Sequence, residues 1–311
     1  MSKLFTERVP YKPFEFPDYY NEGWLKQMQA FWLHTEIPMQ GDVKDWKENL
    51  KSHEKHLVGN ILLGFAQTEC AVSDYWTGMV TKWFPKHEIR QMAMAFGSQE
   101  TIHAVAYSYL NETLGLEDFE AFLHDPATRA RFEMLTEVSA DYTPKDLIES
   151  HKARVDVGRS LAIFSAFAEG VALYSSFAVL YSFQMRNLLK GIGQQMKWSV
   201  RDESLHSKMG CQLFRHMCQE FPELKEEAKE VAKEVSREPL KETTTSAPAG
   251  QKGEPISAKA FSVKVRDTPT TITNKMFRPK TVKEYDPKSE QRKDAITRGL
   301  EAYEAAARNR K

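Results

Sequence analysis

The sequence predicts an all-α protein built as a bundle of long helices. Proline and glycine become sparse across the middle of the chain, where apolar residues recur at helical spacing over several long segments. Two of these segments carry the same Glu-x-x-His element, at Glu100 with His103 and at Glu203 with His206. We find no convincing strand pattern among these segments and therefore expect no sheet.

The first part of the chain is the least regular. Residues 1–20 are rich in proline and aromatic side chains, which indicates an extended arm rather than a helix. Residues 24–32 predict a short helix. Residues 34–46 contain Pro38 and Gly41 and predict a loop.

Long helices are expected after residue 49, separated by residues that break the apolar pattern. Pro85 marks the boundary between the first two, and Gly115 and Pro144 mark later breaks. The helices are expected at residues 52–84, 86–115, 117–135, 144–152, 154–184, 187–219 and 222–236.

One side of the predicted helix at 86–115 carries three polar side chains in an apolar run. At a helical rotation of about 100° per residue, Glu100 and His103 lie about 60° apart, and Tyr107 follows one turn later. The carboxylate of Glu100 and the imidazole of His103 can therefore bind the same ion, and the phenol of Tyr107 lies beside them. Helical bundles hold two metal ions with a pair of such Glu-x-x-His elements and one further carboxylate from each of two other helices. The sequence thus predicts a dimetal site.

Two acids in other helices are candidates for the remaining carboxylates. Glu169 is the lone charged residue of the apolar segment 161–183, where an uncompensated carboxylate would be costly to bury. It therefore requires a metal ion or a buried partner. Glu69 has more polar neighbours, so a solvated position on its helix is the alternative for this residue.

The C-terminal part of the chain has a different composition. From residue 237 onward there are seventeen Lys and Arg against ten Asp and Glu, and residues 239–254 are rich in Thr, Ser, Pro, Lys and Gly. We therefore expect a helical domain with its N-terminal arm at 1–238 and an irregular, basic, linker-like tail at 239–311. Residues 289–308 have the composition of an exposed terminal helix.

Cysteine usage and hydropathy point to a cytoplasmic protein. The three cysteines, Cys70, Cys211 and Cys218, have no C-x-x-C spacing, and no N-terminal signal pattern is visible. The segment 161–183 comes closest to a membrane span, but Glu169 within it favours a buried core helix. We expect neither a membrane nor a nucleic acid as partner.

The ordered set of residues resembles the radical-generating small subunit of class I ribonucleotide reductase, a ferritin-like helical protein. The likeness covers roughly residues 24–221 and rests on Glu69, Glu100-Thr-Ile-His103, Glu169 and Arg201-Asp202-Glu203-Ser-Leu-His206. It implies two sets of metal ligands, in which Glu100 and Glu203 also bridge. The two sets are Glu69, Glu100 and His103 for one ion, and Glu169, Glu203 and His206 for the other.

The resemblance also implies roles for three further residues. Tyr107 corresponds to the radical tyrosine, Trp32 to the tryptophan that begins the electron path toward the large subunit, and Asp202 to the carboxylate that links Trp32 to a metal-bound histidine. Taken singly, Tyr107 also fits a core tyrosine and Trp32 a packing residue. Asp202 also fits an ion pair with Arg201 or Lys197.

The remaining aromatic and apolar residues fit ordinary core packing. We interpret Trp76, Trp83 and Trp198 as packing residues rather than parts of a cofactor site. Leu173 and Phe177 are expected to shield a radical from solvent.

The implied activity is that of ribonucleoside-diphosphate reductase, an oxidoreductase of deoxyribonucleotide synthesis. The dimetal site would use O2 to generate a radical on Tyr107, which a large subunit consumes to reduce ribonucleotides. Iron is the first expectation for both ions. Mn/Fe and Mn/Mn pairs stay open, because residue 69 is Glu where many members carry Asp. A homodimer is expected.

The tail departs from the family, which normally adds further core helices and a C-terminal peptide with a redox tyrosine. Tyr285 and Tyr303 are the tail tyrosines, and neither lies in such a peptide. The tail is therefore a divergent docking segment, an unrelated extension, or part of an incomplete or split small subunit that needs a second chain. Two further functions stay open for the whole chain: a related dimetal ligand-binding oxidase, and a metal-storing or structural bundle.

Overall fold

The computed structural model describes residues 2–227, except 117, 121–123, 125–128, 130–132 and 134–140. All described residues belong to the first of two compact units, Met1–Leu240. The predicted tail and the helix at 289–308 lie outside the described residues, as does most of the helix predicted at 117–135. Within the described part of the chain every regular element is a helix.

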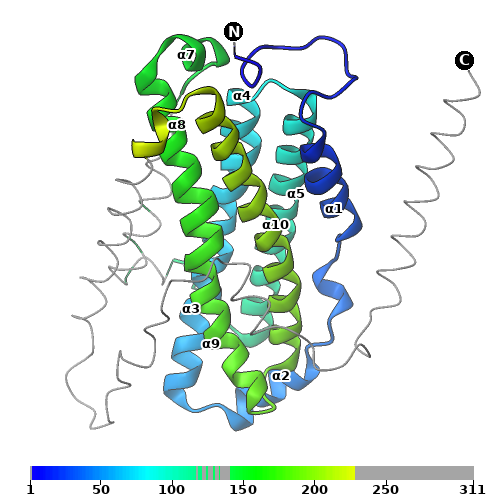
Figure 1. The fold of residues 1–311 in the computed structure, drawn as a ribbon. Coiled ribbons are helices and arrows are strands. Elements are labelled where there is room, and N and C mark those ends of the chain that lie inside the picture. Colours follow the sequence, from blue (N-terminus) through cyan, green and yellow to red (C-terminus); the bar gives the residue numbers. More distant parts are fainter. Residues whose placement is uncertain are drawn as a thin grey trace, which may run out of the picture. The chain divides into compact units, whose positions relative to one another are not determined.

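Long helical segments run up and down beside one another and form the body of the molecule (Figure 1). The first comprises α3 (Ser52–Asp74), η4 (Tyr75–Val80) and α4 (Thr81–Trp83), and the second is α5 (His87–Leu114). The third comprises α8 (His151–Leu161), η6 (Ala162–Ala172) and α9 (Leu173–Met185), and the fourth is α10 (Lys190–Glu220). The main packing contacts join α3 to α5 and α10 to η6 and α9.

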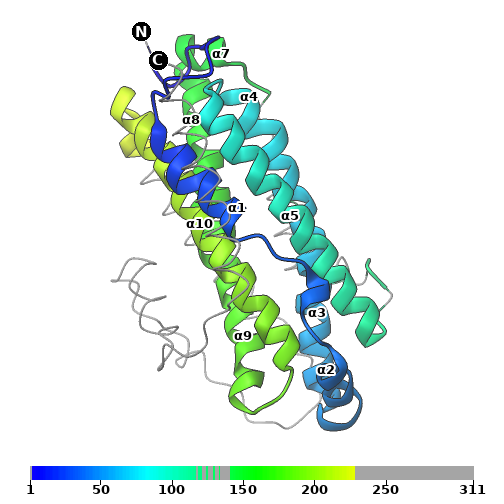
Figure 2. The same cartoon turned by 90° about the vertical axis from the view of Figure 1, so that its right-hand side faces the viewer.

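Shorter elements cover the ends and one side of this bundle. They are η1 (Tyr19–Trp24), α1 (Leu25–Gln29), η2 (His34–Glu36), α2 (Gln40–Lys44), η3 (Asp45–Asn49) and α7 (Pro144–Glu149). Figure 2 shows α1 lying across the bundle, where it contacts α5, while the neighbouring η1 contacts both α5 and α10. The N-terminal segment therefore closes the side between α5 and α10.

Local sequence signals explain several helix ends. Gly115 ends α5 with a φ of 75°, a left-handed conformation that glycine adopts without steric cost. The Thr143 side chain accepts a hydrogen bond from the Asp146 N–H, and Pro144 occupies the first turn of α7. The Ser150 hydroxyl caps α8 by accepting from the Ala153 N–H.

The loop predicted at 34–46 is wrong, because this segment contains helical turns. The reason is a cap formed across the chain: Asp42 in α2 accepts from the backbone N–H groups of Gly191 and Ile192 at 2.8 Å, and Asp45 accepts from that of Leu189 at 2.9 Å. These carboxylates satisfy the free N–H groups at the start of α10. Such a partnership, about 150 positions apart, leaves no local signal.

Three other boundaries differ from the prediction. The short helix predicted at 24–32 spans η1 and α1 together and ends at Gln29. The helix predicted at 144–152 stops at Ser150, whose extended backbone separates α7 from α8. The segment predicted as one helix at 154–184 begins at His151 and turns into a π-helix over η6.

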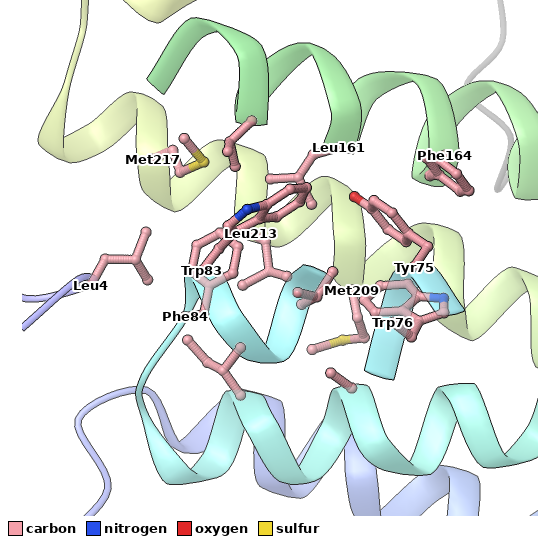
Figure 3. Close-up of a cluster of buried hydrophobic side chains, with 14 of the residues drawn as sticks. Leu4, Tyr75, Trp76, Trp83, Phe84, Leu161, Phe164, Met209, Leu213 and Met217 are labelled. Carbon is pink, nitrogen blue, oxygen red and sulfur yellow. The ribbon is translucent and has the colours of Figure 1, made fainter. Parts of the chain in front are cut away.

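The apolar core has two parts. One is built around Tyr75, Trp76, Trp83 and Phe164, as Figure 3 shows. The other contains Phe65, Tyr107, Leu173 and Phe177. All eight side chains are at most 5% exposed. A polar cluster contacts both parts, and it is described below.

The helical stretch His151–Met185 is long and apolar enough, by length and composition alone, to cross a membrane. It packs against α10 and carries Glu169, whose side chain is fully buried. A buried helix of a bundle core has the same composition, which is the interpretation that we made from the sequence.

The close approach of α3 and α5 depends on Gly97. A Cβ atom there would overlap Thr77 Cγ2 and lie 3.1 Å from the Ser73 carbonyl oxygen. We therefore expect Gly97→Ala to lower the free energy of unfolding by about 1–3 kcal/mol, as overpacking does. Gly78→Ala is the matched control, since a Cβ there meets nothing within 4 Å. Equal denaturant midpoints for the two variants would contradict this account of the helix contact.

Candidate metal centre

Six side chains from the long helical segments meet in the middle of the bundle. They are Glu69 of α3, Glu100 and His103 of α5, Glu169 of η6, and Glu203 and His206 of α10. Each of the six is 0% exposed. The structure thus brings together all the metal ligands predicted from the sequence.

The six residues form two overlapping groups of candidate ligands. The first is Glu69, Glu100, His103 and Glu203, and the second is Glu100, Glu169, Glu203 and His206. Within each group the candidate ligand atoms all lie within 4.8 Å of one another. Glu100 and Glu203 belong to both groups, which is the arrangement of bridging carboxylates.

Both imidazoles direct Nδ1 toward the carboxylates. His103 Nδ1 lies 2.9 Å from Glu100 Oε2 and 2.9 Å from Glu203 Oε1. His206 Nδ1 lies 2.5 Å from Glu100 Oε1 and 3.6 Å from Glu203 Oε2. The same nitrogen of each ring is therefore available for a metal ion.

The opposite nitrogen of each ring has a protein partner. His103 Nε2 lies 3.2 Å from Asp202 Oδ2, and His206 Nε2 lies 2.9 Å from Gln27 Oε1. Since both partners are acceptors, they favour a proton on Nε2 and leave the Nδ1 lone pair directed inward. This is the tautomer that metal binding requires.

The charges of the cluster shift the pKa values of its members strongly. Burial raises the pKa of Glu69 and of Glu169 well above the usual range for Glu. Burial alone would lower the pKa of His103 and His206, but the negative charge of Glu100 raises both well above the ordinary value. Without a metal ion, the cluster therefore holds protons at neutral pH.

The residues fit a pair of metal ions. Glu69 has both carboxylate oxygens buried without a hydrogen-bond partner, and Glu169 has one such oxygen. Among the described residues, no Lys or Arg forms an ion pair with any of the four glutamates. Four buried carboxylates with two imidazoles are a donor set suited to iron or manganese, whose charge would balance theirs.

Tyr107 lies next to this cluster, one turn beyond His103. Its side chain is fully buried, its hydroxyl donates to Ser199 Oγ at 2.8 Å, and its ring centroid is 6.2 Å from that of His103. Phe65 packs on its ring with a centroid distance of 5.0 Å. Burial raises the pKa of the Tyr107 phenol well above its ordinary value.

Trp32 and Asp202 form a line that leads away from His103. The Trp32 Nε1–H donates to Asp202 Oδ2 at 2.7 Å, and the same oxygen lies beside His103 Nε2. The Trp32 ring also stacks on the His103 ring with a centroid distance of 5.6 Å. The structure therefore brings Trp32, Asp202 and Tyr107 to the cluster, as the sequence predicted.

Sequence reasoning missed four side chains that hydrogen-bond to the cluster or to its neighbours Asp202 and Tyr107: Gln27, Trp76, Gln99 and Ser199. The interpretation of Trp76 as a packing residue is incomplete, because its Nε1–H also donates to Glu169 Oε1 at 2.8 Å. Helical spacing offered a signal for two of the four. Trp76 lies seven residues after Glu69, and Ser199 lies four before Glu203.

Comparison with known proteins identifies the family. Residues 8–243 match the family model described as "Ribonucleotide reductase, small chain". The chain belongs to the ribonucleotide reductase small-chain family. The family predicted from the sequence is thus confirmed.

Named relatives of this small chain are longer than it is. A probable ribonucleoside-diphosphate reductase small subunit of Invertebrate iridescent virus 6 is 33% identical over 230 residues, which cover 70% of this chain and 61% of the relative. The ribonucleoside-diphosphate reductase subunit beta of Chlamydia pneumoniae is 29% identical, with 65% and 60% covered. The chain thus spans about 60% of the length of these relatives.

Solved structures share the fold of the small chain. A putative class I ribonucleotide reductase from Bacillus halodurans has a TM-score of 0.57 at 21% identity, covering 71% of this chain and 82% of that one. An R2-like ligand-binding oxidase with a Mn/Fe cofactor has a TM-score of 0.60 at 19% identity, covering 71% and 76%. The predicted all-α, ferritin-like bundle is confirmed.

Metal binding by this cluster should displace protons, because the pKa values of Glu69, Glu169, His103 and His206 are all raised well above their ordinary values. A divalent cation competes with these protons. We therefore expect the affinity for Mn2+ to rise between about pH 6 and pH 8, with net proton release. Calorimetric titration in buffers of different ionisation enthalpy measures the release. Affinity independent of pH, without proton release, would contradict the prediction.

Proposed function

We propose that this small chain is the radical-generating subunit of a ribonucleoside-diphosphate reductase. The observation that carries the proposal is the line from His103 through Asp202 to Trp32, with contacts of 3.2 and 2.7 Å. Asp202 would orient His103 in any metal site, but a storage site or an oxidase acting on its own ligand does not need Trp32 beyond it, so the indole favours radical transfer. The named relatives support the same activity, since one is a probable ribonucleoside-diphosphate reductase small subunit and the other a ribonucleoside-diphosphate reductase subunit beta.

Two metal ions are part of the proposal. Glu69, Glu100 and His103 would hold one ion, Glu169, Glu203 and His206 the other, with Glu100 and Glu203 shared between them. Iron is the first candidate, and Mn/Fe and Mn/Mn pairs stay alternatives, since related folds include oxidases with a Mn/Fe cofactor. The chemistry that such a pair supplies is one-electron oxidation driven by O2.

Tyr107 is the residue that would be oxidised. Its raised pKa keeps the phenol protonated, so it must lose a proton together with the electron. Ser199 Oγ, 2.8 Å from the Tyr107 oxygen, accepts the hydroxyl hydrogen and fixes its direction until that moment. Phe65 and Phe177, whose ring centroids lie 5.2 Å apart, keep water and reductants from the resulting radical.

Trp32 and Asp202 would connect the site to a large subunit. Trp32 is only 3% exposed, but its neighbours Phe31 and Leu33 are 44% and 41% exposed, so the path begins directly beneath the surface. Asp202 accepts the indole N–H and can take up that proton when Trp32 gives up an electron. Reduction of ribonucleotides would then occur on the large subunit.

A homodimer in the cytoplasm completes the proposal. Leu57 of α3 and Met94 and Val105 of α5 are 46%, 55% and 53% exposed, although both helices are otherwise well packed. Apolar side chains on the outer face of two central helices support contact with a second copy.

The first prediction of the proposal concerns Tyr107. Aerobic loading with Fe2+ should give a tyrosyl EPR signal, which Tyr107→Phe removes while both metal ions stay bound, because a phenyl ring is far harder to oxidise. Tyr109→Phe is the matched control on the same helix and should keep the signal. Metal analysis accompanies each spectrum. A tyrosyl signal that persists in Tyr107→Phe would place the radical elsewhere.

The second prediction separates radical formation from radical transfer. Trp32→Phe should retain the metal ions and the Tyr107 radical, yet lose nearly all ribonucleotide reduction with a large subunit, because the path to the surface is broken. Trp198→Phe removes the indole that packs on Trp32 at a centroid distance of 5.3 Å and should keep most activity. Full turnover by Trp32→Phe would refute the proposed path.

A further inference from the structure

Glu69 and Glu169, the two carboxylates from helices without the Glu-x-x-His motif, have different surroundings. Glu69 has both oxygens buried without a hydrogen-bond partner, whereas Glu169 has one such oxygen, Oε2. The other oxygen of Glu169, Oε1, accepts the indole N–H of Trp76 at 2.8 Å. This same Oε1 lies 3.9 Å from His206 Nδ1, so the oxygen that Trp76 holds also faces the cluster.

Trp76 is held firmly in the position from which it donates. Its indole is fully buried and meets the ring of Phe96 edge to face at 5.1 Å and that of Tyr75 at 5.6 Å. Figure 3 shows Trp76 beside Tyr75 and near Met209 in the apolar cluster. A Cβ on Gly210 would lie 3.4 Å from Trp76 Cη2, so α10 approaches the indole closely. Such packing leaves the N–H little freedom to turn elsewhere.

Glu169 itself lies on a backbone that departs from α-helical geometry. It belongs to η6, a π-helix of eleven residues, which is a longer departure from α-helical geometry than the usual single turn. Trp76 comes from a different helical segment, η4, and reaches Glu169 across the bundle. The hydrogen bond thus fixes the carboxylate from outside its own helix.

We propose that Trp76 is a positioning residue for the second metal position: its N–H holds Glu169 Oε1, which also lies 3.9 Å from His206 Nδ1, and so fixes the carboxylate in the orientation that faces the ion. The inference rests on the proposed metal site and deepens it. Removing the N–H leaves Oε1 buried without a donor and the carboxylate free to rotate, so binding of one of the two ions weakens. The other ion, held by Glu69 and His103, keeps its ligands and their orientation.

Packing alone is the rival explanation for Trp76, and Trp83 provides the comparison. Trp83 is equally buried, belongs to the same apolar cluster and lies 5.9 Å from Tyr75 by ring centroids. Replacing either tryptophan by Phe removes the same buried volume. Trp76 is distinguished by its contact with a proposed ligand.

The test is an anaerobic titration of the full metal-free chain with Mn2+ alone, followed by calorimetry and metal analysis. Trp76→Phe should lower the affinity for one of the two ions by roughly 10- to 100-fold, as loss of a hydrogen bond to a metal ligand does. The affinity for the other ion should stay unchanged. Trp83→Phe should bind both ions as the native chain does. Benzothienylalanine at position 76, which has the shape of tryptophan without the N–H, should reproduce the effect of Trp76→Phe even where Phe impairs folding.

The outcomes separate this inference from the proposed function. If the protein with benzothienylalanine binds both ions with native affinity or more tightly, the proposed role of Trp76 is overturned. The proposed metal site is not affected by that result. Equal weakening by Trp76→Phe and Trp83→Phe, with native affinity in the isosteric protein, would assign the effect to packing and also overturn the role of Trp76. A native chain that binds no Mn2+ would overturn the proposed metal site together with this inference.

Discussion

The structure depends on burying four carboxylates at one point of an apolar bundle. Glu69, Glu100, Glu169 and Glu203 are all fully buried, and two imidazoles are the nearest basic groups. In the metal-free chain this arrangement is tolerable because Glu69 and Glu169 take up protons, as their raised pKa values indicate, and because both imidazoles become charged. Metal ions would replace those protons. The same desolvation that opposes folding of the empty site therefore favours its occupation.

The sequence predicted the long helices and the cluster because both follow from helical periodicity. Spacings of three and four residues place Glu100, His103 and Tyr107 on one face of a helix. This holds whatever the helix packs against. Glu169 was recognisable because an isolated charge in an apolar segment requires compensation. These arguments are local, and they succeeded where the structure is regular.

The sequence did not reveal contacts between residues that are far apart in the chain. Gln27 meets His206 across 179 positions, and Asp42 caps α10 across 149 or more. From the sequence alone, Gln27 and Asp42 look like surface residues of short N-terminal turns. Only the position of α10 shows that they are its partners. Trp76 was recognised in the sequence, but only as a packing residue, because an indole fits an apolar core. Its second role, donating its N–H to Glu169 at 2.8 Å, is visible only in the structure.

The repeated Glu-x-x-His motif suggests two equivalent halves, but the surroundings make them different. His103 is backed by the carboxylate of Asp202, whereas His206 is backed by the neutral amide of Gln27. A carboxylate partner makes an imidazole a stronger donor than an amide does. Tyr107 and Trp32 both lie beside His103, with ring centroids at 6.2 and 5.6 Å. Under the proposed function, the half backed by Asp202 is the one next to Tyr107 and Trp32, while the half with His206 is bounded by Trp76 and the apolar cluster. The asymmetry that the chemistry requires is supplied by residues outside the motif.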